Sequence, residues 1–342
     1  MSDTTLNQPA AAVPQNEKID LVASIPFFLV HLVCFAAIWT GVSWQSIAVC
    51  IGLYYVRMTI LTIAYHRYFS HRTFKTSRWF QFLLALGATS SAQKGVLWWA
   101  AHHRHHHRES DQVNDIHSPV QKGFWFSHVG WILCTKYNAT RMESIKDFAR
   151  FPELVWLDKW HLVPPTVLGV IIYLLGGWEM LVVGFFWSTV LLWHGTFTIN
   201  SLSHVFGRRR YKTTDTSRNN WLLALITCGE GWHNNHHYHQ NTANQGWFWW
   251  EVDLSFYTLK VLSWLRIVSD LRLPSDAVKH AYRKYTEEER RELARGGLVL
   301  NPTGKLLERL DKGKKSVREA IAAAQDALPS AGPAPQPLLK RQ

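Results

Sequence analysis

Histidine is concentrated in three short segments of the 342-residue chain. They read HRYFSH at 66–71, HRHHH at 103–107 and HNNHH at 233–237, and a fourth segment, NSLSH, ends at His204. In the second and third segments the histidines are spaced i, i+3 and i+4, which places three imidazoles on one face of a helix. Because that spacing lets the rings converge on one point, we expect metal ligands rather than surface histidines.

The first and fourth segments have different spacings. His66 and His71 are five residues apart, which does not fit one face of an α-helix. We expect His66 to end a long helix and His71 to reach back from the turn beyond it. Asn200 and His204 form an i, i+4 pair at the end of another apolar segment.

Nine histidines and an asparagine are too many for one ion, since a structural zinc takes four ligands and a catalytic zinc three. Two ions with four or five imidazoles each would use them all. Imidazole suits iron, copper, zinc and nickel, whereas calcium and magnesium prefer oxygen ligands. The pattern favours a dinuclear iron site with open positions for oxygen chemistry.

Other polar groups lie close to these ligands in the sequence. His102 and His105 are expected to be spacers or to orient the ligands from outside. Carboxylates that flank the histidines can orient metal-bound rings through the second ring nitrogen or face solvent. Those carboxylates are Glu109, Asp111, Asp115 and Glu230.

The composition is that of a membrane protein. Hydrophobic residues make up 47% of the chain and charged residues 18%, against about a quarter charged in soluble domains. The net charge of +12 is explained by membrane topology, so we expect no nucleic-acid partner. The four cysteines are scattered, which argues against disulfides or a zinc–thiolate site. Residues 1–20 are polar and do not resemble a signal peptide.

The elements that position the histidines are predicted from hydropathy. A spanning helix needs about 20 apolar residues, and four segments qualify: 21–40, 44–65, 161–178 and 180–203. The short connections within each pair contain no Lys or Arg, whereas the segments that follow each pair are rich in both. The positive-inside rule therefore places both termini and the histidine segments in the cytoplasm.

We expect an all-α integral membrane protein with four transmembrane helices in two hairpins. The membrane domain covers 21–281, and its cytosolic helical cap, formed by 66–160 and 205–281, carries the dimetal site. Within the cap, 79–92 is too short to span and 247–273 resembles an interfacial helix. Residues 282–342 form a charged, then Ala/Pro-rich tail that we expect to be disordered.

Four further residues are candidates for contact with a substrate. Arg57 lies inside the second span, where a charged side chain is a functional candidate or makes a structural hydrogen bond. Cys50 and Tyr54 lie deeper on the same helix and could limit the length of a bound chain, or only pack. Lys94 could hold an anionic head group, or anchor the cap at the membrane surface.

Taken together, the motifs resemble the integral-membrane fatty-acid desaturases, specifically the bacterial type of the Δ9 acyl-CoA (stearoyl-CoA-like) branch. The matching elements are YHRYFSHRTFKTSR (65–78), HRHHHRESD (103–111), GFWFSHVGW (123–131), NSLSH (200–204) and CGEGWHNNHH (228–237). The resemblance implies a diiron enzyme that uses O2 and two electrons to insert a cis double bond into a saturated acyl chain. An acyl-CoA is the expected substrate and the bacterial inner membrane the expected location.

The resemblance also assigns residues and partners. It implies that Asn200 reaches a metal through water and that electrons come from a separate donor, because no cytochrome b5 motif is fused to the chain. That donor would be a ferredoxin, a rubredoxin, or a cytochrome b5 with its reductase. The implied metal ligands are His66, His71, His103, His106, His107, His204, His233, His236 and His237.

Two other functions share some of these features. A histidine-box diiron hydroxylase of alkanes, sterols or carotenoids would have the same metal chemistry, but FSHVGW and GEGWHNNHH favour desaturation. A metal transporter or sensor would place its ligands along a path inside the membrane. The histidines here cluster outside the expected spans, so a transporter fits poorly.

Overall fold

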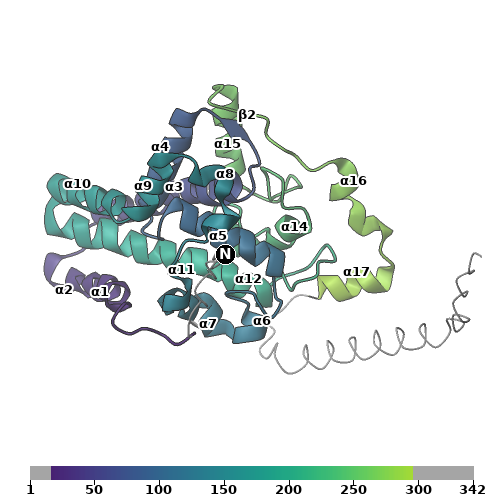
Figure 1. Cartoon of the computed structure of the whole chain (residues 1–342), viewed down its shortest axis with the longest axis horizontal. Helices are drawn as coiled ribbons and strands as arrows, with labels where there is room; N and C mark the ends of the chain where they lie inside the picture. The colour runs from purple at the N-terminus through teal and green to yellow at the C-terminus, as the bar shows by residue number, and fades with distance from the viewer. Residues whose placement is uncertain (1–16, 296–342) are drawn as a thin grey trace, which may run out of the picture. The chain divides into compact units, whose positions relative to one another are not determined.

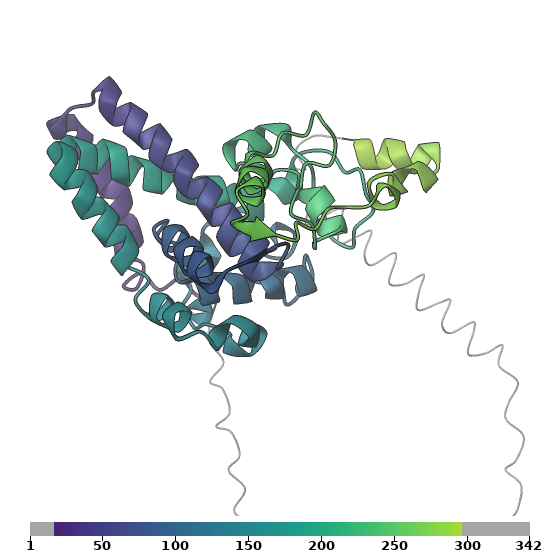
Figure 2. The same cartoon turned by 90° about the horizontal axis from the view of Figure 1, so that it is seen from above.

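The described residues of the chain, 17–295 of the computed structural model, fold mainly into helices joined by loops (Figure 1). Within them, two short antiparallel strands, β1 (Lys75–Thr76) and β2 (Val268–Ser269), form one small sheet. Long apolar helices make up one end of this region and shorter helices with loops make up the other (Figures 1 and 2). We call the second part the cap.

The apolar end is built from two helical pairs. The first pair is interrupted near its start by a short 3₁₀ segment, and the second is one helical run with a sharp turn in it. The elements are α1 (Ile25–Val33), η1 (Cys34–Ala36), α2 (Ala37–Thr40), α3 (Trp44–Leu61), η2 (Thr62–Ser70), α10 (Val163–Glu179), η6 (Met180–Trp187), α11 (Ser188–Asn200) and α12 (Leu202–Val205).

The turn of the second pair lies at two glycines. Gly176 and Gly177 have non-helical backbone angles, and Gly177 combines φ of 67° with ψ of −158°, a region that is essentially restricted to glycine. The chain reverses there, so that η6 and α11 run back beside α10 (Figure 1). Residues 163–205 are therefore a helical hairpin, as expected from the sequence.

The connections of the two hairpins meet. The backbone N–H of Ser43, in the turn before α3, donates to Glu179 Oε1 at 2.6 Å. Ser43 also caps α3, because its hydroxyl accepts from the N–H of Ser46. The two hairpins consequently turn at the same end, away from the cap.

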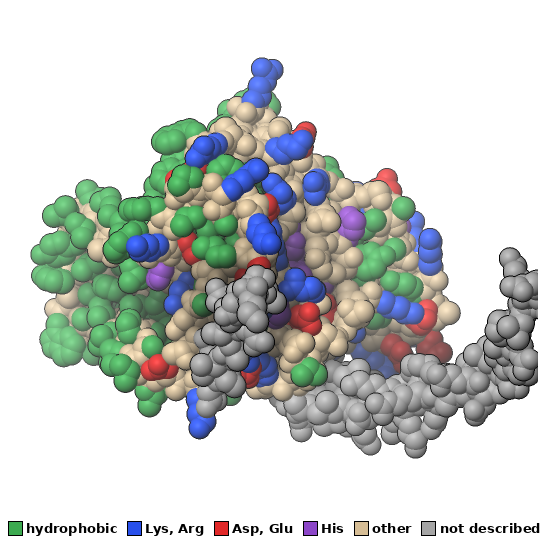
Figure 3. Space-filling view, in the orientation of Figure 1, with side chains coloured by type: hydrophobic (Ala, Val, Ile, Leu, Met, Phe, Trp, Pro, Cys, Tyr) green, Lys and Arg blue, Asp and Glu red, His purple; other side chains and the backbone are tan. Residues whose placement is uncertain are grey.

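The surface of this end is apolar (Figure 3). Trp39, Leu174 and Leu175 are each at least 75% exposed, which a soluble protein rarely permits over a large contiguous patch. Two helices are long and apolar enough to cross a bilayer, Trp44–Ser70 and Val163–Val205, whereas Ile25–Thr40 is shorter. These features indicate membrane association. The sequence expectation of four separate spans remains a prediction.

The cap is formed by the segment between the hairpins and by the segment after them. The first contributes α4 (Arg78–Thr89), α5 (Val96–Glu109), α6 (Pro119–Lys122), α7 (Phe124–His128), η3 (Gly130–Leu133), η4 (Thr135–Tyr137), η5 (Met142–Ser144), α8 (Lys146–Ala149) and α9 (Pro152–Lys159). The second contributes α13 (Trp221–Ile226), α14 (His233–Tyr238), α15 (Leu254–Trp264), α16 (Asp276–Lys279), η7 (Ala281–Lys284) and α17 (Glu287–Ala294).

Two expected segments differ from the structure. Of 247–273, only Leu254–Trp264 is helical, because Asp253 caps α15 by accepting from the N–H of Phe256 and Glu251 holds the preceding turn by accepting from the N–H of Trp247. The expected disorder from residue 282 is wrong at its start, since α17 is a helix with a capping box. Residues 1–16 and 296–342 of the two expected tails lie outside the described part.

Candidate metal centre

Four elements bring the nine predicted histidines together in two neighbouring clusters. The histidines come from the end of η2 and from α5, α12 and α14. The first cluster contains five residues, His66, His71, His103, His107 and His236. The second contains four residues, His106, His204, His233 and His237. Within each cluster, the candidate ligand atoms all lie within 4.8 Å of one another.

His66 and His71 share a cluster because the end of the long helix is a π-helix. In η2 the hydrogen bonds span five residues, and the N–H of His71 bonds the carbonyl of His66 at 3.3 Å. The wider turn places residues five apart on one side of the helix, an arrangement found mostly at functional sites. His71 follows η2 in a turn, as the sequence predicted, whereas His66 lies inside the π-helix and does not end the helix.

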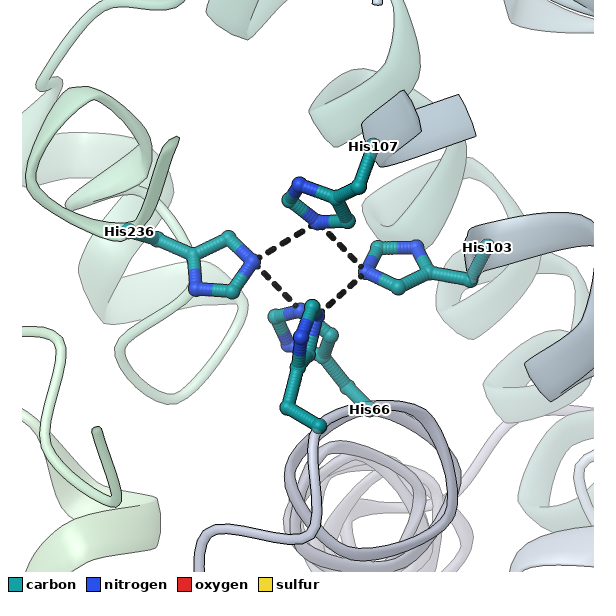
Figure 4. Close-up of side chains that lie close together, drawn as sticks. His66, His103, His107 and His236 are labelled. Atoms are coloured by element: carbon teal, nitrogen blue, oxygen red, sulfur yellow. Dashed lines mark hydrogen bonds between the residues drawn. The ribbon is translucent and has the colours of Figure 1, made fainter. Parts of the chain in front are cut away.

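The nitrogens of the five-histidine cluster point at one another (Figure 4). The Nε2 atom of His236 lies 3.0 Å from that of His66 and 2.9 Å from that of His107. The Nε2 atom of His103 lies 2.9 Å from that of His107 and 3.0 Å from that of His71. Five acceptor nitrogens thus converge on a single point.

The second and third histidine segments each divide between the two clusters. On α5, His103 and His107 belong to the first cluster and His106 to the second. On α14 the division is reversed, because His236 belongs to the first cluster and His233 and His237 to the second. In the second cluster, His204 Nε2 lies 3.1 Å from His233 Nε2. The expectation that each i, i+3, i+4 set meets at one point is wrong. The side chains at i+3 and i+4 are neighbours in sequence, so they point in different directions around the helix axis.

Buried carboxylates fix the orientation of four of the rings. His106 Nδ1 donates to Asp115 at 3.0 Å, His204 Nδ1 to Asp111 at 3.2 Å and His237 Nδ1 to Asp215 at 2.6 Å, while Glu230 pairs with His66 Nδ1. A proton on Nδ1 leaves the lone pair of Nε2 free for a metal. Glu109 makes no such contact and lies beside Arg108 instead.

Asp215 was missed by the sequence reasoning. It lies in a loop 22 residues before its partner, and no helical spacing connects the two. Burial raises the pKa of Asp215, but the contact with His237 outweighs burial and holds that pKa far below its usual range. For Glu230, burial is likewise outweighed by His66 and Arg67, which lower its pKa to about 2. Both groups are therefore carboxylates at neutral pH.

Four of the clustered imidazoles are held in the neutral form at physiological pH. Two causes hold their pKa values well below the usual range, first burial and then repulsion from the neighbouring rings in their charged form. The four residues are His103, His107, His233 and His236. Metal binding requires neutral histidine, so the folded protein presents these ligands without first releasing protons.

The clusters fit first-row transition metals. Imidazole nitrogens bind such metals at about 2.1 Å, so two nitrogens at right angles on one ion lie about 3.0 Å apart and tetrahedral ones about 3.4 Å. The observed separations of 2.9–3.1 Å match the first value. His237 Nε2 is buried and has no hydrogen-bond partner among the described residues, as expected of an unused ligand atom. An ion with more than four positions, such as iron, fits this donor set.

The remaining histidines of the region have other contacts. The Nδ1 atom of His102 bonds the carbonyl of Trp98 at 2.8 Å, and His105 Nε2 bonds the carbonyl of Asn114 at 3.0 Å. Neither ring belongs to a cluster, as the sequence predicted. His117, which the sequence reasoning did not consider, is buried beside His106 and Asp115.

A largely apolar cavity of about 500 Å³ adjoins the five-histidine cluster. His103 forms part of its wall, and Trp99, Trp193 and Phe197 line it together with the predicted residues Lys94 and Asn200. Lys94 Nζ donates to Asn138 in the same wall at 3.1 Å. The cavity has the size and lining typical of a site for an apolar ligand.

The other three predicted substrate residues are not in this wall. Tyr54 donates to the carbonyl of Ile226 at 2.8 Å, and Arg57 donates to the hydroxyls of Ser188 and Thr189 at 2.6 and 2.9 Å. These contacts fit structural roles on α3. Cys50 is buried on the same helix.

Comparisons with known proteins agree with this geometry. A sequence model of the fatty acid desaturase family matches residues 42–260. The sn-1 stearoyl-lipid 9-desaturase of Synechocystis sp. is 36% identical over 279 residues, which cover 78% of this chain and 86% of that protein. An enzyme of the same name from Anabaena variabilis is 36% identical over 265 residues, or 77% and 97% of the two chains.

A relative with another kind of substrate in its name is also similar. The acyl-CoA C20 Delta5-desaturase of Anemone leveillei is 34% identical over 253 residues, which cover 73% of this chain and 80% of that protein. The matched regions contain all nine clustered histidines, since the family match alone extends from residue 42 to residue 260. The chain belongs to the fatty acid desaturase family.

Proposed function

We propose that this protein is an O2-dependent diiron desaturase that introduces a cis double bond at carbon 9 of a saturated acyl chain. The observation that carries the proposal is the contact between the five-histidine cluster and the apolar cavity, which share His103. In the overall reaction, one CH2–CH2 unit, one O2, two electrons and two protons yield one CH=CH unit and two water molecules. Two iron ions, one per cluster, would supply the chemistry that activates O2.

The residues of the chain position the metals and the substrate. The nine imidazoles hold the ions, and the carboxylates of Asp111, Asp115, Asp215 and Glu230 hold four of the rings in place. The aromatic wall of the cavity excludes water and keeps a methylene pair close to His103. Asn200, which lines the same cavity, is proposed to reach a metal through water.

For the acyl carrier, we propose a glycerolipid. The sequence favoured acyl-CoA, but the names of the Synechocystis and Anabaena relatives specify lipid-linked chains. The cavity lies beside the apolar helices α1 and α11, from which Phe27, Val30 and Thr196 reach its wall. A membrane lipid could therefore insert one chain directly from the bilayer, with Lys94 close to its polar part.

The proposed enzyme is an integral protein of the bacterial inner membrane, with four spans and a cytoplasmic cap. The apolar surface of the hairpins, the common end at which they turn and the Lys and Arg residues of the cap support this orientation. Two electrons per double bond are proposed to come from a separate carrier protein.

Expression in a host without its own desaturase tests the reaction. We expect new monounsaturated fatty acids with the bond at carbon 9, located by mass spectrometry of disulfide derivatives. The His236→Ala variant should abolish them. His239→Ala is the matched control, because His239 lies two residues after the same motif and outside both clusters. Hydroxylated products would instead assign the protein to the hydroxylases. Feeding labelled acyl-CoA and labelled phospholipid to isolated membranes distinguishes the two carriers.

A further inference from the structure

A second opening reaches the five-histidine cluster from another side. It is a cleft of about 700 Å³, and His71 and His107 form part of its lining. None of its lining residues is shared with the apolar cavity, which meets the cluster at His103. The cluster therefore lies between an apolar cavity and a separate polar cleft.

The cleft is strongly basic. Its lining includes one carboxylate, Asp147, and five cationic side chains. The cations are Arg72, Lys75, Arg104, Arg108 and Arg272. Lys and Arg side chains crowd the middle of the face shown in Figure 3, and histidine side chains are visible between them. Such a field attracts anionic partners and raises their rate of association.

One of the five cations has a structural role. Arg104 donates to both carboxylate oxygens of Asp147, at 2.9 and 3.0 Å, and to the carbonyls of Phe69 and Ser70. Arg104 thereby holds the end of η2 against α5, and it also neutralises the only carboxylate of the lining. The positive charge available to a partner comes from the other four side chains.

Those four side chains are exposed around the rim. The side chain of Arg72 is 53% exposed, that of Lys75 76% and that of Arg108 58%, and Arg272 is also exposed. Three of them are in surface pairs, Arg72 with Asp147 at 3.3 Å, Lys75 with Asp270 at 2.8 Å and Arg108 with Glu109 at 3.6 Å. Such surface pairs are weak. They can be exchanged for contacts with a partner at little cost.

We propose that this cleft is the docking surface for an acidic one-electron carrier protein. The proposal rests on the proposed desaturase function, which requires two electrons per double bond. Each reduced carrier gives up one electron, so two carriers dock in turn for every double bond. The two electrons from the carriers and two electrons from the substrate reduce one O2 to two water molecules. Two of the four protons come from the substrate and two from solvent.

The position of the cleft favours a protein over a lipid head group or a nucleotide. A head group is covalently attached to the acyl chain and must stay near the mouth of the apolar cavity, where Lys94 lies. The four exposed cations instead surround the approach to His71 and His107. A carrier seated on this rim faces the part of the cleft lined by the metal-ligand candidates His71 and His107, which shortens the path for the electron.

A charge-neutralised enzyme tests the proposal. The cleft variant combines Arg72→Gln, Lys75→Gln and Arg272→Gln. The matched control replaces three exposed lysines outside the cleft and combines Lys159→Gln, Lys260→Gln and Lys284→Gln. The probes are a plant-type [2Fe–2S] ferredoxin and the soluble domain of a cytochrome b5, both acidic. Binding to the full-length iron-loaded enzyme is measured against salt concentration, and the KM values for carrier and acyl substrate are measured separately.

In the cleft variant, we expect the KM and Kd for the preferred carrier to rise by about 10-fold or more, because steering by charge raises association rates by about 10-fold or more. The KM and Kd should also depend less on salt concentration than in the wild type. The KM for the acyl substrate and the yield of a single turnover driven by dithionite should stay at the wild-type values. The control should resemble wild type in every measurement.

Other results overturn the proposal. An unchanged KM for the carrier, an increase confined to the KM for the acyl substrate, or failure of both acidic probes to bind the wild-type enzyme would each show that the cleft does not dock the carrier. Failure of the proposed function is recognised differently, because the wild-type enzyme would then form no unsaturated product even with dithionite.

Discussion

Asp215 is the residue whose role is most directly testable. Its carboxylate fixes the ring of His237 from a loop outside the histidine motifs. Asp215→Asn should lower metal affinity or activity by about 10- to 100-fold, as is typical when the partner of a metal-bound histidine is lost. The measurement is iron per chain after dialysis against a chelator.

The matched control for this substitution is Glu109→Gln. Glu109 was a candidate in the sequence, together with Asp111 and Asp115, but it lies beside Arg108 and contacts no clustered histidine. It should retain the iron content of the wild type. Equal iron loss in both variants, or none in Asp215→Asn, would contradict the assigned role.

Arg67 tests how much a buried ion pair contributes to the stability of the protein. Its guanidinium is 1% exposed and bonds both Glu230 at 3.0 Å and Asp253 at 2.9 Å. Arg67→Leu removes the cation that these two buried carboxylates share and should cost about 3–5 kcal/mol of stability. The melting temperature of the metal-free protein in detergent reports this loss without a contribution from bound iron.

An exposed pair provides the comparison. Arg78 bonds Glu153 at 2.7 Å, but its side chain is 62% exposed. Arg78→Leu should leave the melting temperature close to that of the wild type, because solvent screens the pair. Similar melting temperatures for the two variants would show that the buried network contributes no more than a surface contact.

Among the elements, the hairpin of residues 163–205 depends on one backbone conformation. Gly177 has φ of 67° and ψ of −158°, and a side chain there is strained even though no atom lies within 4 Å of its added Cβ. Gly177→Ala should therefore destabilise the protein by about 1–3 kcal/mol. Thermal unfolding in detergent measures the change.

Gly52 is the matched control on α3. An added Cβ there also meets no atom within 4 Å, but its backbone is helical. Gly52→Ala should leave stability unchanged or raise it by about 0.5–1 kcal/mol, since glycine is unfavourable inside a helix. If Gly177→Ala were equally harmless, the sharp turn would not depend on glycine.

At the scale of the whole molecule, the apolar cavity adjoins a second one, lined mainly by the hairpin of residues 163–205. The second has a volume of about 390 Å³ and shares Val30, Ala92, Leu162 and Trp193 with the first. The end of a long acyl chain is expected to pass this junction. Val30→Phe narrows it and should shift the products toward shorter chains by about 10-fold or more.

The control is the neighbouring substitution Leu29→Phe. Leu29 is 51% exposed on the outer surface of α1 and lines neither cavity. Its product profile, measured by gas chromatography of total fatty acids, should match that of the wild type. An unchanged profile for Val30→Phe would show that the chain ends before the junction.

The sequence by itself determined the identity of the clustered histidines and the positions of the helical hairpins. Histidines at helical spacing and long apolar runs are local signals, because each depends only on the period of one helix. Counting ligands led to the expectation of two ions with four or five imidazoles each, and the structure groups the nine histidines as five and four. The local signals also separated His102 and His105 from the ligands.

Tertiary structure decided how those residues are shared. His103 and His106 lie on one helix, yet they face different clusters because α5 packs between η2 and the loop that carries Asp111 and Asp115. Contacts between segments distant in sequence also decide three other features. They are the π-helix that joins His66 to His71, the pairing of His237 with Asp215, and the separation of the apolar cavity from the basic cleft. Such contacts leave no periodic signal in the chain, so only the folded structure reveals them.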